Sequence, residues 1–467
     1  MIENCYRKTR PWWVALSLLF VLLIQVGCSD DKNIENGDQA EVPGDNNGET
    51  RYLPLIEITT SGTIVDEPKI RSMMKITEEE EITFDGIAGI EIRGASSQMF
   101  DKKSYGLETW DNNNEDINVS LLGMPEEEDW VLHGPYSDKS LIRNKLIYDL
   151  STDIGRYASR TRFVELIING DYKGVYVFME KLKRDKNRID ISKLEPDENS
   201  GEDLTGGYIL KIDKIAGNNL GEGYNDQNSF ASEVAPPFAG GGEIRFLYEY
   251  PDAEDISPEQ KAYIQEYVRG FEDALQSEEF RDPELGYAAY IDVESFIDFF
   301  ILNEISNNVD GYRLSTFMHK DKNGKLAMGP IWDFNLAFGN ADYCGGGDTD
   351  KWAYKFNERC PGDFWAVPFW WYRLLEDPDF VQQLKERWNS LRGTALSDQT
   401  VLDRIASYQS EMQEVDAIDR NFSRWEILGK WIWPNNFVGM TYSSERIFVE
   451  EWVVDRLDWL DSAIDGL

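Results

Sequence analysis

Two aspartates, Asp310 and Asp333, lie on either side of a predicted β-hairpin and are the side chains best placed for chemistry. The hairpin is expected to have strands at about residues 314–320 and 325–331, joined by an Asn-Gly turn. Because a hairpin brings its two ends together, the two carboxylates are expected to lie close in space. One carboxylate of such a pair can accept the proton of an attacking hydroxyl, while the other holds a metal ion on a phosphate.

This order of parts is typical of protein kinases, which place a catalytic Asp before a short hairpin and a metal-binding Asp, followed by Phe, after it. On this interpretation Asp310 is the base, and Asp333, which precedes a Phe, is the metal ligand. The alternative is a structural hairpin whose flanking Asp residues only cap and solvate the turn. The run from Asp321 to Gly324 lacks the spaced acids and the final Glu of a calcium loop, so a turn is the better interpretation.

The composition narrows the classes of function that the chain could have. It has 86 Asp and Glu against 47 Lys and Arg, a formal net charge of −39 that repels nucleic acid, so no nucleic-acid partner is expected. His133 and His319 are the only histidines, so a three-His zinc site cannot form. Carboxylates, which prefer Mg, Mn or Ca, are the expected metal ligands. With 41% hydrophobic residues, the 467-residue chain can bury a large core, as one two-lobed domain or as two domains.

The N-terminus has the pattern of a bacterial lipoprotein signal. Basic residues precede an apolar run from Trp12 to Gly27, which ends at Cys28. A membrane-spanning helix is the alternative, but a run of about 16 residues is short for a bilayer. Residues 1–28 are therefore interpreted as a signal peptide with its lipobox Cys, although Gln25 stands where Leu is usual.

The segment that follows is expected to tether the protein to a membrane. Residues 29–50 are acidic and rich in Gly and Asn, which predicts a flexible linker. Asp30 and Asp31 resemble the surface-export tag of Bacteroidetes lipoproteins. We therefore expect an extracytoplasmic protein of the outer membrane or cell surface, bound to the membrane only through the lipid on Cys28. Of the remaining cysteines, Cys344 and Cys360 could form a disulfide or stay as two free buried thiols, and both alternatives are open.

Periodicity predicts a β-rich first part and a helical second part. Residues 51 to about 110 alternate like the strands of an antiparallel sheet. The other expected elements are a helix at Ser140–Asp149, a hairpin across Asn169–Asp171, a strand at Tyr208–Ile212, a long loop at Ala216–Gly242, a helix capped by Ser257 that ends near Gln276, a helix capped by Asp292, and mainly helix beyond about residue 363.

Four sequence blocks resemble, in order, the motifs of the CotH family of atypical kinases, named after spore coat protein H. They are IRGASS from Ile92 with KKSY from Lys102, the segment from Trp130 to Asn144, the segment from Ile168 to Tyr176 with Glu180, and the segment from Asp310 to Asn340. The resemblance implies an α+β, atypical protein-kinase-like two-lobed fold that binds ATP with Mg or Mn and phosphorylates Ser or Thr of a secreted protein. The kinase-like domain is expected at 51–465, with a β-rich N-terminal lobe at about 51–215 and a helical C-terminal lobe at about 244–465.

The resemblance also implies roles for single residues. Asp310 falls on the family's catalytic Asp and Asp333 on its metal-binding Asp. Many members carry an acid where this chain has Asn335, whose carbonyl oxygen could still bind a metal. Lys103 and Glu180 are the candidates for the nucleotide-binding Lys and its acidic partner.

Other implied roles leave alternatives open. Lys102 is adjacent to Lys103 and would point to the opposite face of a strand. Arg93 and Arg143 are candidates either for clamping phosphate oxygens or for structural salt bridges. A second departure, Ser315–Thr316 in place of the family's Asn, keeps a catalytically weak or inactive surface binding or adhesion protein as the alternative function. The 15 Trp residues leave a glycan enzyme as a further alternative.

Overall fold

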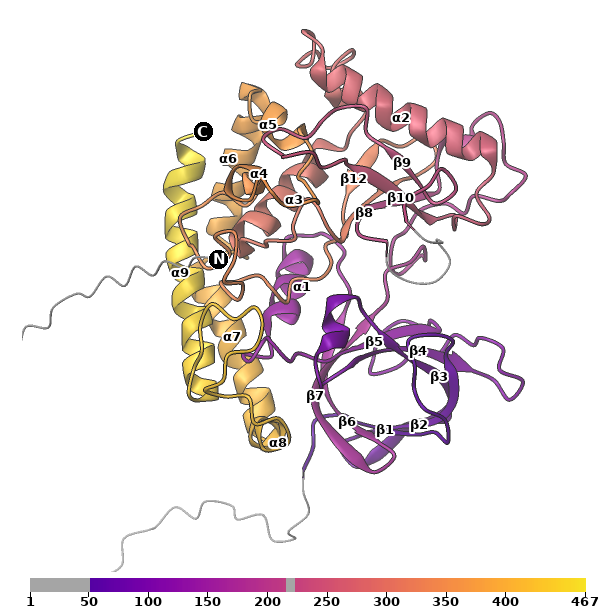
Figure 1. The fold of residues 1–467 in the computed structure, drawn as a ribbon, viewed down its shortest axis with the longest axis vertical. Coiled ribbons are helices and arrows are strands. Elements are labelled where there is room, and N and C mark those ends of the chain that lie inside the picture. The colour runs from indigo at the N-terminus through magenta and orange to yellow at the C-terminus, as the bar shows by residue number, and fades with distance from the viewer. Residues whose placement is uncertain (1–50, 216–222) are drawn as a thin grey trace, which may run out of the picture. The chain divides into compact units, whose positions relative to one another are not determined.

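The computed structural model describes residues 51–215 and 223–467. The expected signal and tether, residues 1–50, lie outside the described residues. Seven strands of the first part form a closed barrel (Figure 1). They are β1 (Leu55–Thr59), β2 (Ile70–Glu78), β3 (Glu81–Arg93), β4 (Ser104–Trp110), β5 (Asp129–His133), β6 (Thr161–Ile168) and β7 (Asp171–Glu180).

Neighbouring barrel strands are antiparallel except where β1 pairs with β6 in parallel and closes the ring. The interior is filled by apolar side chains, among them Trp130, Phe178 and Leu107, which are fully buried. Because these side chains fill the barrel, a ligand has to bind outside it.

Local sequence signals account for much of the barrel. The predicted hairpin across Asn169–Asp171 is confirmed as β6–β7, where Asn169 and Gly170 both have positive φ, at 51° and 77°. Such a two-residue turn matches the twist of the flanking strands. The runs EITFDG and IAGIEIRG together form one long strand, β3.

A second sheet of five strands follows the barrel in the order β12-β11-β8-β10-β9. The strands are β8 (Tyr208–Ile212), β9 (Ser229–Ala231), β10 (Arg245–Tyr250), β11 (Thr316–Lys320) and β12 (Leu326–Met328). The predicted strand at Tyr208–Ile212 is confirmed, and it joins this sheet instead of the barrel. The short strand β9 lies inside the segment that was expected to be loop throughout, of which residues 216–222 are outside the described part.

Helices make up most of the remaining chain. They are α1 (Arg143–Asp153), α2 (Pro258–Gln276), α3 (Val293–Ser306), α4 (Phe356–Arg359), α5 (Trp370–Leu374), α6 (Pro378–Arg392), α7 (Asp398–Gln413), α8 (Ala417–Arg424) and α9 (Tyr442–Asp465). The predicted caps are confirmed, since Ser257 and Gln260 form a capping box on α2 and the Asp292 side chain accepts a hydrogen bond from Ser295 N.

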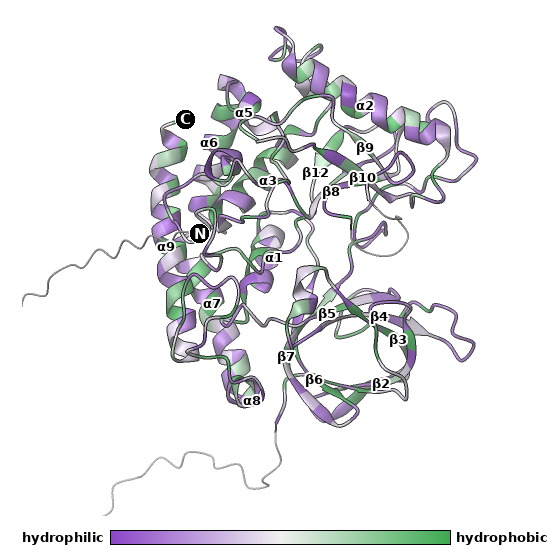
Figure 2. Cartoon of the chain, in the orientation of Figure 1, coloured by the Kyte–Doolittle hydropathy of each residue, from purple (hydrophilic) through white to green (hydrophobic). Residues whose placement is uncertain are grey.

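The helices enclose a large aromatic and aliphatic core. Trp370, Trp371 and Phe300 are fully buried in it. In Figure 2, α2 and α9 carry both hydrophobic and hydrophilic residues, as expected for helices that bury one face. No helix in residues 51–215 and 223–467 is long and apolar enough to cross a membrane.

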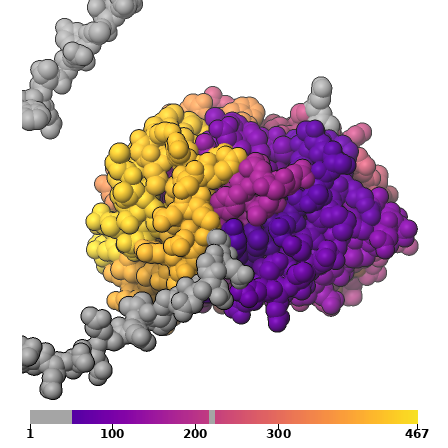
Figure 3. All heavy atoms as spheres, turned by 90° about the horizontal axis from the view of Figure 1, so that it is seen from below, coloured from indigo at the N-terminus to yellow at the C-terminus, as the bar shows by residue number. Residues whose placement is uncertain are grey.

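The C-terminal helices pack directly on the barrel. Figure 3 shows the C-terminal residues, in yellow, against the N-terminal ones, in indigo and magenta. Helix α8 lies on β7, and Arg420 pairs with the buried Glu165 of β6 at 2.7 Å. Asn421 Oδ1 accepts a hydrogen bond from Lys102 Nζ at 2.9 Å. These contacts fix the barrel relative to the helical part.

Candidate active site

A cavity in the described part of the chain measures about 820 Å³, a size typical of ligand sites. Its walls come from the open ends of β3 and β5, from β8 and from the loops around the β11–β12 hairpin. Of the candidate residues, Arg93, Asp310, Asp333 and Asn335 line it. The expected meeting of the two aspartates at one site is therefore confirmed.

Asp310 is held just beyond the C-terminus of α3. Asn307 adopts a left-handed conformation with φ 40° and ends the helix. Asp310 N then donates to Asn308 Oδ1 at 3.1 Å, and Asp310 Oδ1 accepts from Arg313 Nη2 at 2.9 Å. One carboxylate oxygen is thus fixed, while the other receives no hydrogen bond from the described residues and remains available to a ligand.

Asp333 is held by α1, although the two are far apart in sequence. Asp333 N donates to Tyr148 Oη at 3.0 Å, and Phe334 N donates to Asn144 Oδ1 at 2.7 Å. Asp333 itself has φ 64°, which is unusual for a residue with a side chain and is common at functional sites. The helix therefore holds a strained turn that directs this carboxylate into the cavity.

A third carboxylate approaches the two aspartates. Asp213 follows β8, lines the cavity, and accepts from Lys214 N at 2.8 Å and from Ser315 Oγ at 3.4 Å. Burial, with the charges of Asp310 and Asp213, raises the pKa of Asp333 to about 6 against the opposing effect of Arg93 and Lys214. Mutual repulsion of carboxylates is relieved by a bound cation, so the site has the chemistry of a divalent-metal site.

Two cations that line the cavity, Arg93 and Lys214, form no close ion pair with the described residues. The Arg93 guanidinium lies 5.5 Å from the ring centre of Trp332, and the Lys214 ammonium lies 5.2 Å from that of Trp365. Neither side chain makes a hydrogen bond or an ion pair with any residue that the structure describes. Their charges are therefore available to an anionic ligand such as a phosphate. By contrast Lys211, on the same strand as Tyr208, pairs with Glu249 at 2.7 Å.

The expected pair of Lys103 and Glu180 does not form. Strand β4 begins only at Ser104, so Lys103 precedes the strand, and its Nζ donates to Gln98 O at 2.7 Å and to Phe100 O. These two carbonyls follow the segment from Gly94 to Ser97, which lines the cavity, but Lys103 is not one of the lining residues. Lys102 is buried, with Val175 O and Asn421 Oδ1 as acceptors.

Glu180 and Arg143 also lie outside the cavity lining. Glu180, at the end of β7, pairs with Arg160 at 2.8 Å and accepts from Tyr157 Oη at 3.1 Å. Arg143, at the start of α1, pairs with Asp138 and donates to Ala337 O at 3.0 Å. Its contacts are those of a structural salt bridge that ties α1 to the segment after Asp333.

One tight acidic cluster lies at the cavity wall. Within residues 51–215 and 223–467, only Glu127, Glu128 and Asp129 bring three ligand oxygens within 4.8 Å of one another. Lys183 forms ion pairs with all three, at 2.6 to 3.1 Å. Arg188 also pairs with Glu127 at 3.1 Å and Lys181 with Asp129 at 3.4 Å, so cations of the protein itself balance the charge of the cluster.

The sequence-based prediction missed Asp213, Lys214 and His133 as cavity residues. A usable signal exists for the strand YILKID, where Lys211 and Asp213 stand on the same face of an otherwise apolar strand. His133 ends β5, and burial lowers its pKa to about 4, so it is neutral at pH 7. Nothing in the spacing of Arg313, three residues after Asp310, marks it as the partner of that aspartate.

Comparison with known proteins identifies the family of the chain. A search of curated proteins finds no match. Residues 90–460, which include every candidate site residue, match the family model described as CotH kinase protein. The match begins in β3 and ends in α9, so it covers the open end of the barrel, the second sheet and the helices together. The chain therefore belongs to the CotH kinase family.

Proposed function

We propose that the protein is an ATP- and divalent-metal-dependent kinase that phosphorylates Ser or Thr of an extracytoplasmic protein. The observation that carries the proposal is the composition of the cavity: two carboxylates meet the unpaired cation Arg93 in a space of about 820 Å³. The carboxylates suit a metal, the cations suit phosphates, and the volume suits a nucleotide. We also infer that the barrel and the helical part correspond to the two lobes of a kinase.

The residues of the cavity would have separate roles in phosphate transfer. Asp333 and Asn335 would hold the metal ion, which supplies positive charge to the phosphates when it is bound. Arg93 and Lys214 would bind phosphate oxygens. Asp310 would accept the proton of the acceptor hydroxyl as its oxygen bonds to the γ-phosphorus, and ADP would leave with the electrons of the broken bond.

The test compares Asp310→Asn with Asp333→Asn in the intact ectodomain. Asp310→Asn should retain nucleotide affinity and lose phosphate transfer by about 10²–10⁴-fold, because a proton acceptor is removed. Asp333→Asn should lose metal-dependent nucleotide binding as well. Asp455→Asn, on the exposed face of α9, is the matched control and should behave as the wild type.

Two measurements decide the outcome. Calorimetric titration of ATP with Mg, Mn or Ca measures binding, and transfer of labelled phosphate to generic Ser/Thr proteins measures activity. A wild-type protein that neither binds nor transfers would refute the proposal. Binding without transfer would favour the alternative function, a kinase-like surface binding protein, for which Asn335 in place of an acid is the specific observation.

The location is a second part of the proposal, and it rests on the sequence. We propose that a lipid on Cys28 anchors the protein and that residues 29–50 tether it outside the cytoplasm. Expression of the full chain with a labelled fatty acid should label the wild type and leave Cys28→Ala unlabelled. Equal labelling of both proteins would rule the anchor out.

A further inference from the structure

Arg313 is the only charged partner of Asp310 among the described residues. Its side chain is almost completely buried, with 2% of it exposed. Besides Asp310 Oδ1 it contacts three acceptors: Nε donates to Val309 O at 2.8 Å, and Nη1 donates to Asp363 Oδ1 at 3.2 Å and to Trp365 O at 3.3 Å. Four acceptors around one planar group leave it a single orientation.

The ring of Phe356 closes the remaining side of this group. The guanidinium carbon lies 3.9 Å from the ring centre, a stacking geometry that favours Arg over Lys. Phe356 belongs to α4, and Asp363 and Trp365 follow that helix closely in the chain. Most of the groups that hold Arg313 in place therefore belong to one segment, residues 356–365, which lies outside the Asp310–Asp333 hairpin.

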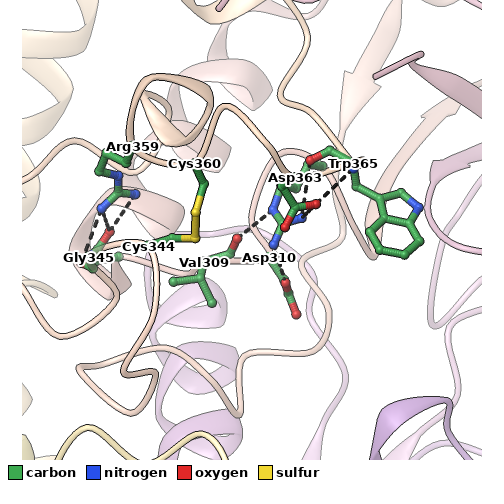
Figure 4. Close-up of a disulfide and its surroundings, with 10 residues drawn as sticks. Val309, Asp310, Cys344, Gly345, Arg359, Cys360, Asp363 and Trp365 are labelled. Atoms are coloured by element: carbon green, nitrogen blue, oxygen red, sulfur yellow. Dashed lines mark hydrogen bonds and ion pairs between the residues drawn. A yellow bond between two sulfur atoms is a disulfide. The ribbon is translucent and has the colours of Figure 1, made fainter. Parts of the chain in front are cut away.

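A disulfide fixes that segment. Cys344 and Cys360 are bonded, which resolves the two alternatives left open by the sequence. In Figure 4 the disulfide lies between Arg359 and Gly345 on one side and Asp310, Asp363 and Trp365 on the other. Because the bond closes the chain around α4, it restrains the acceptors that orient Arg313.

We propose that Arg313 is a positioning residue for Asp310, held in place by Asp363, Trp365 and Phe356, and that it turns one carboxylate oxygen away so that the other faces the acceptor hydroxyl. This inference rests on the proposed function, since it assigns Asp310 the role of base. Arg313 lines the cavity, but all its hydrogen bonds within the described residues go to protein acceptors, so the proposal predicts a defect in turnover instead of nucleotide binding. Asp363 also lines the cavity, so the segment that holds Arg313 in place forms part of the cavity wall.

The experiment compares Arg313→Lys and Asp363→Asn with the wild type. A lysine keeps the charge but cannot reach four acceptors, so kcat should fall by about 100-fold, as expected for a base misplaced by roughly 1 Å, with KM for ATP within about twofold. Asp363→Asn, a milder change at a side chain that is 26% exposed, should lower kcat in the same direction and keeps the test available where Arg313→Lys fails to fold.

Arg456→Lys is the matched control. Arg456 is as deeply buried, pairs with Glu304 at 3.1 Å and donates to backbone carbonyls, but it does not line the cavity. This variant should lower the melting temperature and leave kcat unchanged. A crystal structure of Arg313→Lys supplies a readout that does not depend on activity, and the Asp310 carboxylate should be rotated in it.

Wild-type kcat retained in Arg313→Lys, a defect confined to KM for ATP, or an unmoved Asp310 in the crystal would each overturn the positioning role. An inactive wild type would instead count against the proposed function. In that case the crystal structure alone still decides whether Arg313 orients the aspartate.

Discussion

Replacing the Cys344–Cys360 disulfide by two serines is expected to lower the free energy of unfolding by about 3 kcal/mol. The two cysteines are 16 positions apart, and a cross-link over a loop of that size removes about this much conformational free energy from the unfolded chain. The double variant Cys344→Ser/Cys360→Ser is preferred to a single one, because a single variant leaves a free thiol.

Unfolding in urea, followed by tryptophan fluorescence, measures the effect. With a slope of about 3 kcal/mol per M, the loss of about 3 kcal/mol corresponds to a fall of about 1 M in the midpoint. Wild type in a thiol reductant should match the double variant, and the double variant should not respond to the reductant. That second comparison is the control for effects of the reductant on the rest of the protein.

The same variant tests how the disulfide is connected to Asp310. If the segment closed by the disulfide holds Arg313 in place, kcat of the double variant should be lower than that of the wild type at urea concentrations well below the unfolding midpoint. Equal midpoints for oxidised wild type and double variant would refute the stability argument. A lower midpoint with an unchanged kcat would show that the disulfide is not needed to position Arg313.

Three further changes have defined outcomes. Asn144→Ala leaves Phe334 N without its acceptor and should lower the free energy of unfolding by about 1–3 kcal/mol, measured as a urea midpoint; an unchanged midpoint would contradict the role of α1. Glu304→Gln leaves the buried Arg456 without a counter-charge and should lower the free energy of unfolding by about 3–5 kcal/mol in the same assay. An unchanged midpoint would show that the ion pair does not stabilise the protein. Burial raises the pKa of Glu272 from 4.5 to about 7, so wild type should lose up to about 3 kcal/mol as pH rises through that range, where the unfolded chain ionises and the folded one does not. Glu272→Gln cannot ionise and should lack this decline between pH 4 and pH 8, whereas parallel pH profiles would contradict the assignment.

Elements determined by nearby residues could be predicted from the sequence. The Asn169–Gly170 turn and the capping box of Ser257 and Gln260 depend on side chains within three positions of one another. The meeting of Asp310 and Asp333 follows from the same kind of local information, because one hairpin connects them. These features need no knowledge of the remaining fold.

Contacts between distant elements could not be predicted in this way. The motif resemblance placed Lys103 and Glu180 together, but the strand that was expected to carry Lys103 begins one residue later, and Lys103 turns back to the carbonyls of its own loop. Glu180 finds Arg160 across the β6–β7 pair instead. Spacing along the chain says nothing about which of several nearby charges a buried carboxylate will contact.

The acidic composition makes the unpaired cations of the cavity informative. With 86 acids against 47 basic residues, a Lys or Arg has many carboxylates to pair with, and most buried cations of the described residues do so. Arg93 and Lys214 form no ion pair with the described residues, although several carboxylates line the same cavity and one of them, Asp213, is adjacent to Lys214 in the chain. Both side chains are half-buried at the cavity, where an anionic ligand could supply the counter-charge. The excess of acids, which argues against a nucleic-acid partner, therefore also supports the proposal that these two cations bind the phosphates of a nucleotide.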